Sequence, residues 1–299
     1  MSMKPCLTAD MRFDARQVEA LLAIVEEGSF DAAARRLHLT PSAISQRIRA
    51  LEGAAGSVLV RRTAPARATE AAMPLVRLGR HLRLLAAEAE AALGLDGAVD
   101  LPIAVNADSL ATWFRPVFAA VATLPGVALQ LHVEDQARSH GLLRRGEVLA
   151  AVTDEPEPVQ GCSVVRLREQ RYSPLATPAL VAAHRHGTGV AWDAMPVVVF
   201  NEADRLQDRA LEQQASQRPR VVHRVPTSAD FLAAVRAGLG WGMLPDEQAA
   251  PAVAAGALVS VPGGRHLDVT LYWQRWRLQS DSLEAVTREV RRAAIGTDV

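Results

Sequence analysis

The 299-residue chain is predicted to be an α/β protein that begins with an all-α winged helix-turn-helix and continues into two doubly wound α/β subdomains. Three short helical patterns, separated by tight breaks, fill residues 16–51 and are typical of a small helical head. From residue 97 onward, strand and helix patterns alternate in two successive sets. Such alternation predicts parallel strands covered by crossover helices.

Composition and charge restrict the class of protein. Hydrophobic residues make up 49% of the chain and the formal net charge is zero, which is ordinary for a globular protein. No apolar run approaches the roughly 18 residues of a membrane span, and the first residues lack the apolar core of a secretory leader. The two cysteines, Cys6 and Cys162, form neither a disulfide framework nor a metal-binding spacing. We therefore expect a cytoplasmic protein without membrane contact, with Met11 as an alternative natural start to Met1.

The zero net charge hides one strongly basic stretch. Between Arg35 and Arg67 the chain carries seven arginines, and Glu52 is the only acidic residue there. A small basic module on an otherwise neutral chain is typical of a domain that meets the phosphates of nucleic acid. An arginine-rich face that is merely solvated is the alternative on charge alone.

Apolar spacing and capping residues predict the three N-terminal helices. Apolar residues at helical spacing favour a first helix over residues 16–27, which a glycine ends. Ser29 suits the N-cap of a second helix over residues 30–37. Thr40 suits the N-cap of a third helix over residues 41–51, and the proline at its first position needs no helical partner for its missing N–H.

Two short helices across a tight turn, the second with a polar outer face, predict a helix-turn-helix that binds DNA. We expect Ser42, Ser45 and Gln46 at base edges in the major groove, and Arg47 and Arg49 nearer the DNA backbone. An ordinary helical hairpin in a core is the alternative, and the basic bias argues against it. The full predicted set for DNA binding is Ser29, Thr40, Pro41, Ser42, Ala43, Ser45, Gln46, Arg47, Arg49, Arg61, Arg62 and Arg67.

A wing is predicted directly after the recognition helix. Residues 58–60 suit a short strand and residues 64–66 suit a turn. This arrangement places Arg61, Arg62 and Arg67 beside flanking phosphates or a minor groove. The winged helix-turn-helix domain is therefore predicted to cover residues 13–68.

A long helix is predicted to follow, capped by Thr69 and ending near Gly94. Its apolar residues lie three and four apart, which makes a stripe suited to packing against another helix. Such a stripe often belongs to an intramolecular core, but the small preceding domain offers little to cover it. We therefore predict a linker and dimerisation helix over residues 69–95. The residues of the stripe are Leu75, Leu78, Leu82, Leu85 and Ala89.

The remainder of the chain alternates strands with helices. Strands are predicted over residues 101–105, 127–133, 148–152, 197–200, 220–225 and 269–273. Helices are predicted over residues 109–122, 203–215, 229–237 and 282–294, and a further helix runs through residues 142–145. This order predicts an α/β region with two similar halves.

From Phe13 onward the chain resembles a known family. The stretch FDARQVEALLAIVEEGSFDAAARRLHLTPSAISQRIRALE, followed by VLVRRT, is similar to the N-terminal domain of LysR-type transcriptional regulators. The later stretches VNADSLATWF, VED, LRRGEV, PVQGC and LYWQRW resemble the lysine- and arginine-responsive, LysG/ArgP-like branch of that family. The segment before Phe13 departs from the usual start of the family.

The resemblance implies an effector-binding domain over residues 96–299, with two subdomains that resemble periplasmic binding proteins and are joined by two crossing strands. One subdomain would comprise residues 96–170 and 267–299, because the last strand and helix return to it, and the other residues 171–266. The resemblance also implies a homodimer, and a homotetramer that contacts two sites on double-stranded DNA. It further implies activation of a basic-amino-acid exporter gene, lysine or arginine as coinducer and no other cofactor, with RNA polymerase as a possible partner.

Ligands of open α/β sheets bind beyond the carboxyl ends of the strands, often at a helix N-terminus. For an amino acid, Ser109, Thr153 and Ser228 would bind the α-carboxylate, and one of four acids would pair with a cationic side chain. Both serines also suit N-caps, and acids in a first turn suit the helix dipole, so structural roles are the alternative. The predicted effector-binding residues are Asn106, Asp108, Ser109, Thr153, Asp154, Glu155, Phe200, Asp204, Ser228 and Asp230; the four acids are Asp154, Glu155, Asp204 and Asp230.

Enzyme signatures are missing from the sequence. No GxSxG stretch is present, and the pair His184 and His186 lacks the cysteine or acidic partners of a metal site. GLGWGM at residues 238–243 follows a helix, so it reads as a turn before a strand and not as a dinucleotide motif. We predict a transcriptional regulator that is no enzyme and holds no metal. The alternatives are the same architecture sensing a different metabolite and, in another class, a solute-binding transport receptor.

Overall fold

The structure is a computed structural model that describes residues 12–95, 97–133, 136–214 and 216–296. Cys6, Met1, Met11 and the predicted boundary residue Asp96 lie outside these residues. The chain forms two compact units: an N-terminal unit of Met1–Val99 with Arg145–Glu147, and a C-terminal unit of Asp100–Arg144 with Val148–Val299.

The N-terminal unit begins with the three predicted helices, α1 (Ala15–Glu27), α2 (Phe30–Arg36) and α3 (Pro41–Ala55). Their caps are those that the sequence predicts. The hydroxyl of Ser29 accepts the N–H of Ala32 at 3.1 Å, and that of Thr40 accepts the N–H of Ala43 at 3.2 Å. These bonds satisfy backbone donors that a helix start leaves without partners.

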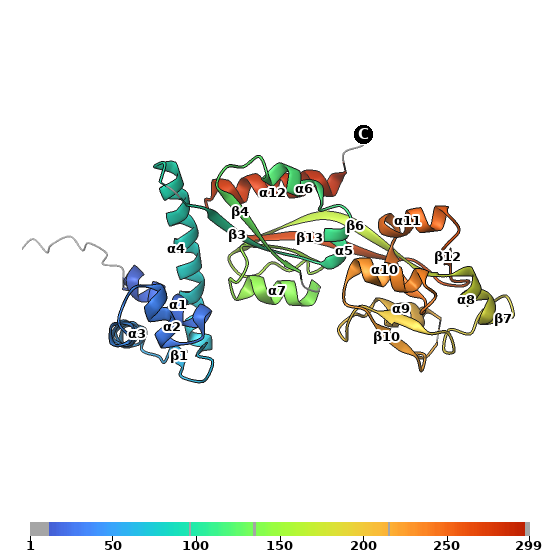
Figure 1. Ribbon diagram of the computed structural model, residues 1–299, viewed down its shortest axis with the longest axis horizontal. Helices are drawn as coiled ribbons and strands as arrows, with labels where there is room; N and C mark the ends of the chain where they lie inside the picture. Colours follow the sequence, from blue (N-terminus) through green and yellow to red (C-terminus); the bar gives the residue numbers. More distant parts are fainter. Residues whose placement is uncertain (1–11, 96, 134–135, 215, 297–299) are drawn as a thin grey trace, which may run out of the picture. The chain divides into compact units, whose positions relative to one another are not determined.

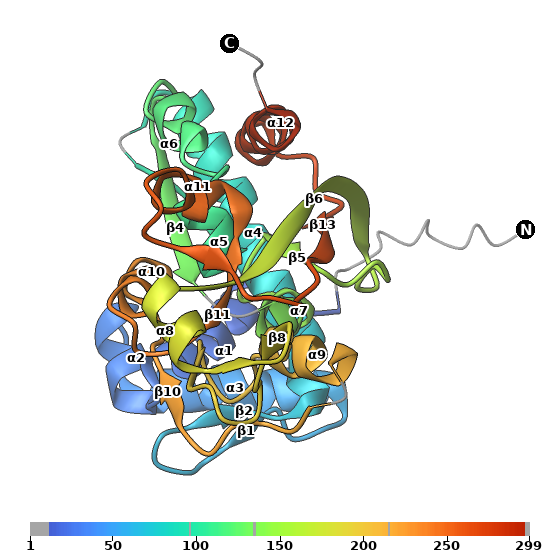
Figure 2. The same ribbon diagram turned by 90° about the vertical axis from the view of Figure 1, so that its right-hand side faces the viewer.

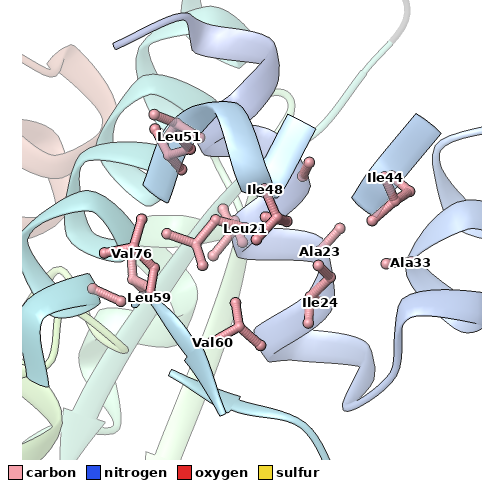
Figure 3. Close-up of a cluster of buried hydrophobic side chains, with 14 of the residues drawn as sticks. Leu21, Ala23, Ile24, Ala33, Ile44, Ile48, Leu51, Leu59, Val60 and Val76 are labelled. Atoms are coloured by element: carbon pink, nitrogen blue, oxygen red, sulfur yellow. The ribbon is translucent and has the colours of Figure 1, made fainter. Parts of the chain in front are cut away.

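A shared apolar core fixes the angle between these helices. Leu21 and Ile24 of α1 and Ile44 and Ile48 of α3 are fully buried, and Ala33 of α2 lies in the same cluster (Figure 3). Burying each large aliphatic side chain contributes roughly 1.5–3 kcal/mol. The alanines of α2 let the neighbouring helices approach closely, so α3 is held rigidly with its outer face free.

The predicted wing is present but begins later than expected. Strands β1 (Val60–Arg61) and β2 (Arg67–Ala68) pair antiparallel, with Val60 opposite Ala68. The expected strand start at residue 58 is wrong because the N–H groups of Leu59 and Val60 bond to the Glu52 carboxylate, at 2.9 and 3.4 Å. A 3-10 turn, η1 (Glu70–Ala72), then leads into the long helix α4 (Met73–Ala92).

The first subdomain of the C-terminal unit contains β3 (Val99–Val105), β4 (Val127–Val133) and β5 (Ala150–Thr153), with helix α7 (Gln136–Arg144). Strands β3 and β5 are parallel, as predicted. The single helix expected over residues 109–122 is instead two, α5 (Ala107–Ala111) and α6 (Pro116–Val121). Thr112 leaves helical geometry, with φ −116° and ψ −104°, and Pro116 starts the second helix at a position where its missing N–H costs nothing.

Two long antiparallel strands, β6 (Cys162–Ala176) and β13 (Leu267–Trp276), run through both subdomains. They lie in one mixed seven-stranded sheet of order β11-β6-β13-β5-β3-β4, in which β12 (Val259–Ser260) also pairs with β6. Helix α12 (Asp281–Ile295) then packs beside α6 on one face of the sheet, with α7 on the other (Figures 1 and 2). The last strand and helix thus lie against elements of the first subdomain, β13 beside β5 and α12 beside α6.

The second subdomain lies between β6 and β13 in the sequence. Its own core gathers Val198, Phe231, Val235 and Leu258. Its parallel strand pair, β9 with β10, is separate from the seven-stranded sheet. The elements are α8 (Pro178–Ala183), β7 (Arg185–His186), β8 (Gly189–Val190), β9 (Val197–Val199), α9 (Leu206–Gln213), β10 (Val222–Arg224), α10 (Ser228–Arg236), β11 (Gly242–Pro245) and α11 (Asp246–Ala254).

Candidate functional site

The outer face of α3 presents the polar side chains that the sequence assigns to DNA. Ser42, Gln46 and Arg49 are exposed, whereas Ser45 and Arg47 are half-buried. The hydroxyls of Thr40 and Ser42 lie 2.9 Å apart, so the cap and the first turn share a hydrogen bond. A rigid helix with small polar groups in its first turn can enter a major groove without large side chains in the way.

The wing arginines are exposed, and one of them is oriented by an aromatic ring. The guanidinium carbon of Arg62 lies 4.7 Å from the centroid of the Phe30 ring, which is a cation–π contact. Phe30 is the first residue of α2, so this contact ties the wing to the helix-turn-helix. Arg61 and Arg67 lie opposite each other in the β1–β2 pair.

The apolar stripe of α4 divides into a buried and an exposed part. Leu75 belongs to the core of the N-terminal unit, so the prediction that it faces a partner chain is not supported by its place in the fold. Leu78, Leu82 and Leu85 stay 36–39% exposed. Ala89 is exposed as well.

The C-terminal unit encloses a cavity of about 270 Å³ between the strand ends and helix starts of its two subdomains. Both subdomains and the strand β6 contribute walls. The lining residues are Asn106, Ala107, Asp108, Asp154, Tyr172, Phe200, Asn201, Ala203, Asp204, Arg205, Leu206, Arg209, Phe231, Met243, Leu244, Pro245 and Val269.

Five of the ten predicted effector residues line this cavity: Asn106, Asp108, Asp154, Phe200 and Asp204. The other five are placed elsewhere by local structure. The side chain of Asn106, not Ser109, caps α5, by accepting the Ser109 N–H at 3.0 Å. Likewise Thr227, not Ser228, caps α10. The N-cap roles considered for Ser109 and Ser228 are therefore wrong.

The remaining predicted residues serve the loops next to the cavity. The hydroxyl of Thr153 accepts the N–H of Glu155 at 3.1 Å, which turns the chain after β5. Asp230 is exposed and accepts a 2.6 Å hydrogen bond from the Thr227 hydroxyl. Ser228 does not line the cavity but contacts a residue that does: its hydroxyl donates a hydrogen bond to Asp108 at 2.8 Å.

Asp108 is the most enclosed charge of the cavity. Burial raises the pKa of its carboxyl group, and the hydrogen bonds from the hydroxyls of Ser228 and Tyr172, the latter at 3.0 Å, oppose that rise. Burial also raises the pKa of Tyr172 well above its ordinary value, and the neighbouring Asp108 adds to the shift. The Tyr172 hydroxyl thus stays protonated and donates to the carboxylate.

Asp204 is held by the loop that follows β9. Its two carboxylate oxygens accept the N–H groups of Phe200 at 2.9 Å and Leu206 at 3.0 Å. Burial raises the pKa of Asp204, and these backbone hydrogen bonds oppose the rise. The carboxylate is therefore rigidly placed beside the cavity at the start of α9.

Sequence reasoning missed several lining residues. Tyr172 comes from β6, one of the two crossing strands that the resemblance implies; the residue pattern did not locate this strand, because charged residues interrupt its apolar pattern. Arg205 and Arg209 lie four apart in a predicted helix directly after Asp204, and this spacing was a usable signal because such residues share one helix face. The lining residues Met243 and Leu244 belong to β11.

A winged helix-turn-helix joined to a two-lobed unit with a polar cavity defines the class of DNA-binding transcriptional regulators that respond to small ligands. This chain belongs to the LysR family. Residues 15–73 match the family of bacterial regulatory helix-turn-helix proteins of the lysR type, and residues 100–294 match the LysR substrate binding domain. Among the described residues, no helix is both long and apolar enough to cross a membrane.

Similar proteins are known in sequence and in structure. The lysine export transcriptional regulatory protein LysG of Corynebacterium glutamicum is 48% identical, covering 93% of this chain and 97% of that protein. Full-length LysG from the same organism, solved with the effector Arg bound, superposes with a TM-score of 0.82 at 45% identity over 95% of this chain and 98% of that one. ArgP of Mycobacterium tuberculosis superposes with a TM-score of 0.86 at 47% identity, with the same coverage.

Proposed function

We propose that the protein binds a basic amino acid, lysine or arginine, in the cavity of the C-terminal unit and thereby controls transcription of a basic-amino-acid exporter gene. The charge of the cavity supports this ligand class most directly. Asp108, Asp154 and Asp204 bring three carboxylates to its lining, and Arg205 and Arg209 bring two guanidinium groups. The lining thus has an excess of one negative charge, and a basic amino acid carries one net positive charge.

The positions of these groups suggest how the two ends of the ligand would be read. Arg205, the residue directly before α9, and Arg209 within α9 suit a carboxylate, which guanidinium groups bind with two parallel hydrogen bonds. The three aspartates suit the α-ammonium group and the side-chain cation. Arg205 also pairs with Asp208 at 3.1 Å, so Arg209 is the stronger candidate for the carboxylate. The relative solved with bound Arg supports a ligand of this class.

DNA recognition is assigned to the exposed face of α3 and to the wing. Ser42, Ser45 and Gln46 would read base edges, and the arginines of α3 and β1–β2 would bind phosphates. The exposed leucines of α4 would pair two chains, and a dimer of dimers would bring pairs of heads to two DNA sites. Contact with RNA polymerase would follow from activation of the exporter gene.

Ligand control requires that the basic amino acid bind two arrangements of the protein with different affinity. The cavity is lined by both subdomains, so a ligand that contacts both favours one angle between them. A change of that angle in each chain of an oligomer would alter the spacing of the DNA-binding heads. Tight binding alone, without such a difference, would leave transcription unchanged.

The test is calorimetric titration of the full-length protein with lysine, arginine, norleucine and glutamate, with and without the DNA upstream of its gene. Norleucine has the chain length of lysine but lacks the distal cation. We expect binding of lysine or arginine, altered by the DNA, and no binding of norleucine or glutamate. Equal affinity for norleucine and lysine would remove the basic side chain from recognition. No binding of either basic amino acid would reject the ligand assignment and leave DNA binding in place.

A further inference from the structure

The loop after β5 forms one wall of the cavity and depends on side chains for its backbone hydrogen bonds. Between Glu155 and Val159 the chain contains two prolines, which have no N–H. The three other residues there, Glu155, Glu157 and Val159, supply the donors. Each of these N–H groups bonds to a side chain: to Thr153 at 3.1 Å, to the carboxylate of Glu155 at 3.4 Å and to Gln274 at 3.1 Å.

Gln274 makes more bonds to this loop than any other side chain described above. It is fully buried on β13, opposite Ala151 of β5. Its amide oxygen accepts the Val159 N–H, and its amide nitrogen donates to the carbonyl oxygens of Glu155 at 2.8 Å and Glu157 at 2.9 Å. One side chain therefore uses its acceptor and both donors on three alternate residues of a five-residue loop.

Only a group with both donors and an acceptor at this position can bind the loop in this way. An apolar side chain of equal size would leave two carbonyl groups and one N–H without partners in a buried place, which is unfavourable for the folded loop. The loop would then adopt other conformations. Asp154, which lines the cavity, directly precedes the bonded residues and would move with them.

We infer that Gln274 is a positioning residue of the ligand site: it does not line the cavity, and it fixes Asp154 through the Glu155–Val159 loop. This inference rests on the proposed function, in which Asp154 is one of the carboxylates that meet the cationic groups of the ligand. Gln274 lies outside the cavity on β13, one of the two strands that cross between the subdomains. From this position it contributes to the affinity for basic amino acids.

The test uses Gln274→Met, which keeps the length and burial of the side chain and removes its three hydrogen bonds. Thr287→Val is the matched control. It removes the 3.2 Å hydrogen bond from the indole N–H of Trp273, the residue next to Gln274, to a different partner on α12. Both variants lose buried hydrogen bonding at the same strand, so a general loss of stability affects both.

The first measurement is hydrogen exchange of the ligand-free, full-length protein. In Gln274→Met the amides of Glu155, Glu157 and Val159 should exchange at least about tenfold faster, and in Thr287→Val they should not. Unchanged exchange of these amides in Gln274→Met would overturn the inference, whatever the protein binds.

The second measurement is the Kd for arginine. Gln274→Met should raise it about tenfold, which corresponds to about 1.4 kcal/mol. In an Asp154→Asn background the same substitution should add less than about twofold, because its effect passes through Asp154. Fully additive losses would overturn the positioning role. If the wild-type protein binds neither arginine nor lysine, the proposed function and the ligand role of Gln274 both fail, while the exchange data still decide whether Gln274 holds the loop.

Discussion

At the scale of single residues, two opposing influences act on the pKa of each buried carboxyl group of the cavity, Asp108 and Asp204. Burial raises the pKa of each, and hydrogen bonds to each carboxylate oppose the rise. The donors differ: hydroxyls of Ser228 and Tyr172 for Asp108, and backbone N–H groups for Asp204. A cation bound in the cavity stabilises the charged form of both carboxylates, as water does for an exposed carboxylate. Cation and proton therefore compete for these groups.

This competition predicts the pH dependence of ligand affinity. As pH falls through the raised pKa values of Asp108 and Asp204, the carboxylates become neutral and the Kd for arginine should rise. The contribution of these two groups to the free energy of unfolding changes with pH in the opposite direction. The folded protein binds these protons more tightly than the unfolded chain does, so their contribution favours folding at low pH and is lost as pH rises through the raised pKa values. Calorimetric titrations with arginine at a series of pH values from neutral downward would check this, and a Kd that stays constant down to the pH at which the protein unfolds would contradict it.

Asp204→Asn tests the charge at the start of α9. The asparagine keeps an acceptor for one of the two backbone N–H groups but removes the negative charge. The Kd for lysine and arginine should rise about tenfold or more, since charge-assisted hydrogen bonds are about twice as strong as neutral ones. Asp230→Asn is the control, because Asp230 is exposed and does not line the cavity. Calorimetry that shows equal losses in both variants would contradict a specific role for Asp204.

The candidate ligand site was predictable only in part, because strand ends are easier to locate than the direction of side chains. The rule of strand ends selects five residues that line the cavity, Asn106, Asp108, Asp154, Phe200 and Asp204. It also selects Thr153 and Glu155, which do not line the cavity. Their side-chain oxygens accept backbone N–H groups of the loop after β5. Nothing in the local sequence shows that distinction, since it depends on how far the chain turns after β5.

At the scale of elements, the contact of α1 with α4 depends on a single glycine. A side-chain carbon at Gly79 would lie 3.1 Å from a methyl carbon of Val18 and 3.3 Å from one of Leu22. These distances are tighter than ordinary contact, so the two helices can approach this closely only with glycine there. By contrast, a side-chain carbon at Gly53, inside α3, would meet nothing within 4 Å.

Substitutions at these two glycines should therefore have opposite signs. Gly79→Val should lower the free energy of unfolding by about 1–3 kcal/mol through overpacking. Gly53→Ala should raise it by roughly 0.5–1 kcal/mol, because alanine restricts the unfolded chain and favours helix. Urea denaturation of the full-length protein, followed through the transition of the N-terminal unit, measures both. Stabilisation by Gly79→Val would show that the α1–α4 packing differs from the one described.

The wing is the second element with a direct test. Arg61→Ala should reduce the slope of log affinity for DNA against log salt concentration by about 1, as loss of one phosphate contact requires. Arg36→Ala is the control from the same domain, since Arg36 is paired with Glu26 at 2.7 Å and Glu27 at 3.2 Å. Equal slopes for Arg61→Ala and wild type would exclude a phosphate contact by the wing at this position.

Elements with strong local signals were predictable, and those that depend on distant pairing were not. Ser29, Thr40 and Pro41 define the starts of α2 and α3 by rules that involve only neighbouring residues. Strand β6 has no such signal: its charged residues Arg166, Arg168 and Glu169 break the alternation, and the strand is stabilised by pairing with β13 about a hundred residues later.

At the scale of the whole molecule, the exposed leucines of α4 predict the oligomeric state. Leu82→Glu should lower the association of chains, because a charge would be buried in an apolar seam between two helices. Ala91→Glu is the control, since at 100° per residue Ala91 lies on the opposite side of α4 from Leu82 and is exposed. Analytical ultracentrifugation distinguishes the species. An unchanged mass for Leu82→Glu would move the interface away from this stripe.

The pairing of β6 with β13 also has a consequence for how this protein can diverge. The chain leaves the first subdomain on one strand and re-enters it on the adjacent antiparallel strand, with Tyr172 opposite Leu267. The second subdomain is thus, topologically, an insertion at the tip of a hairpin. Because both of its ends sit on neighbouring strands, insertions and deletions inside it leave the register of the hairpin intact. Half of the cavity wall can therefore change in evolution while the other half and the DNA-binding head are inherited unaltered.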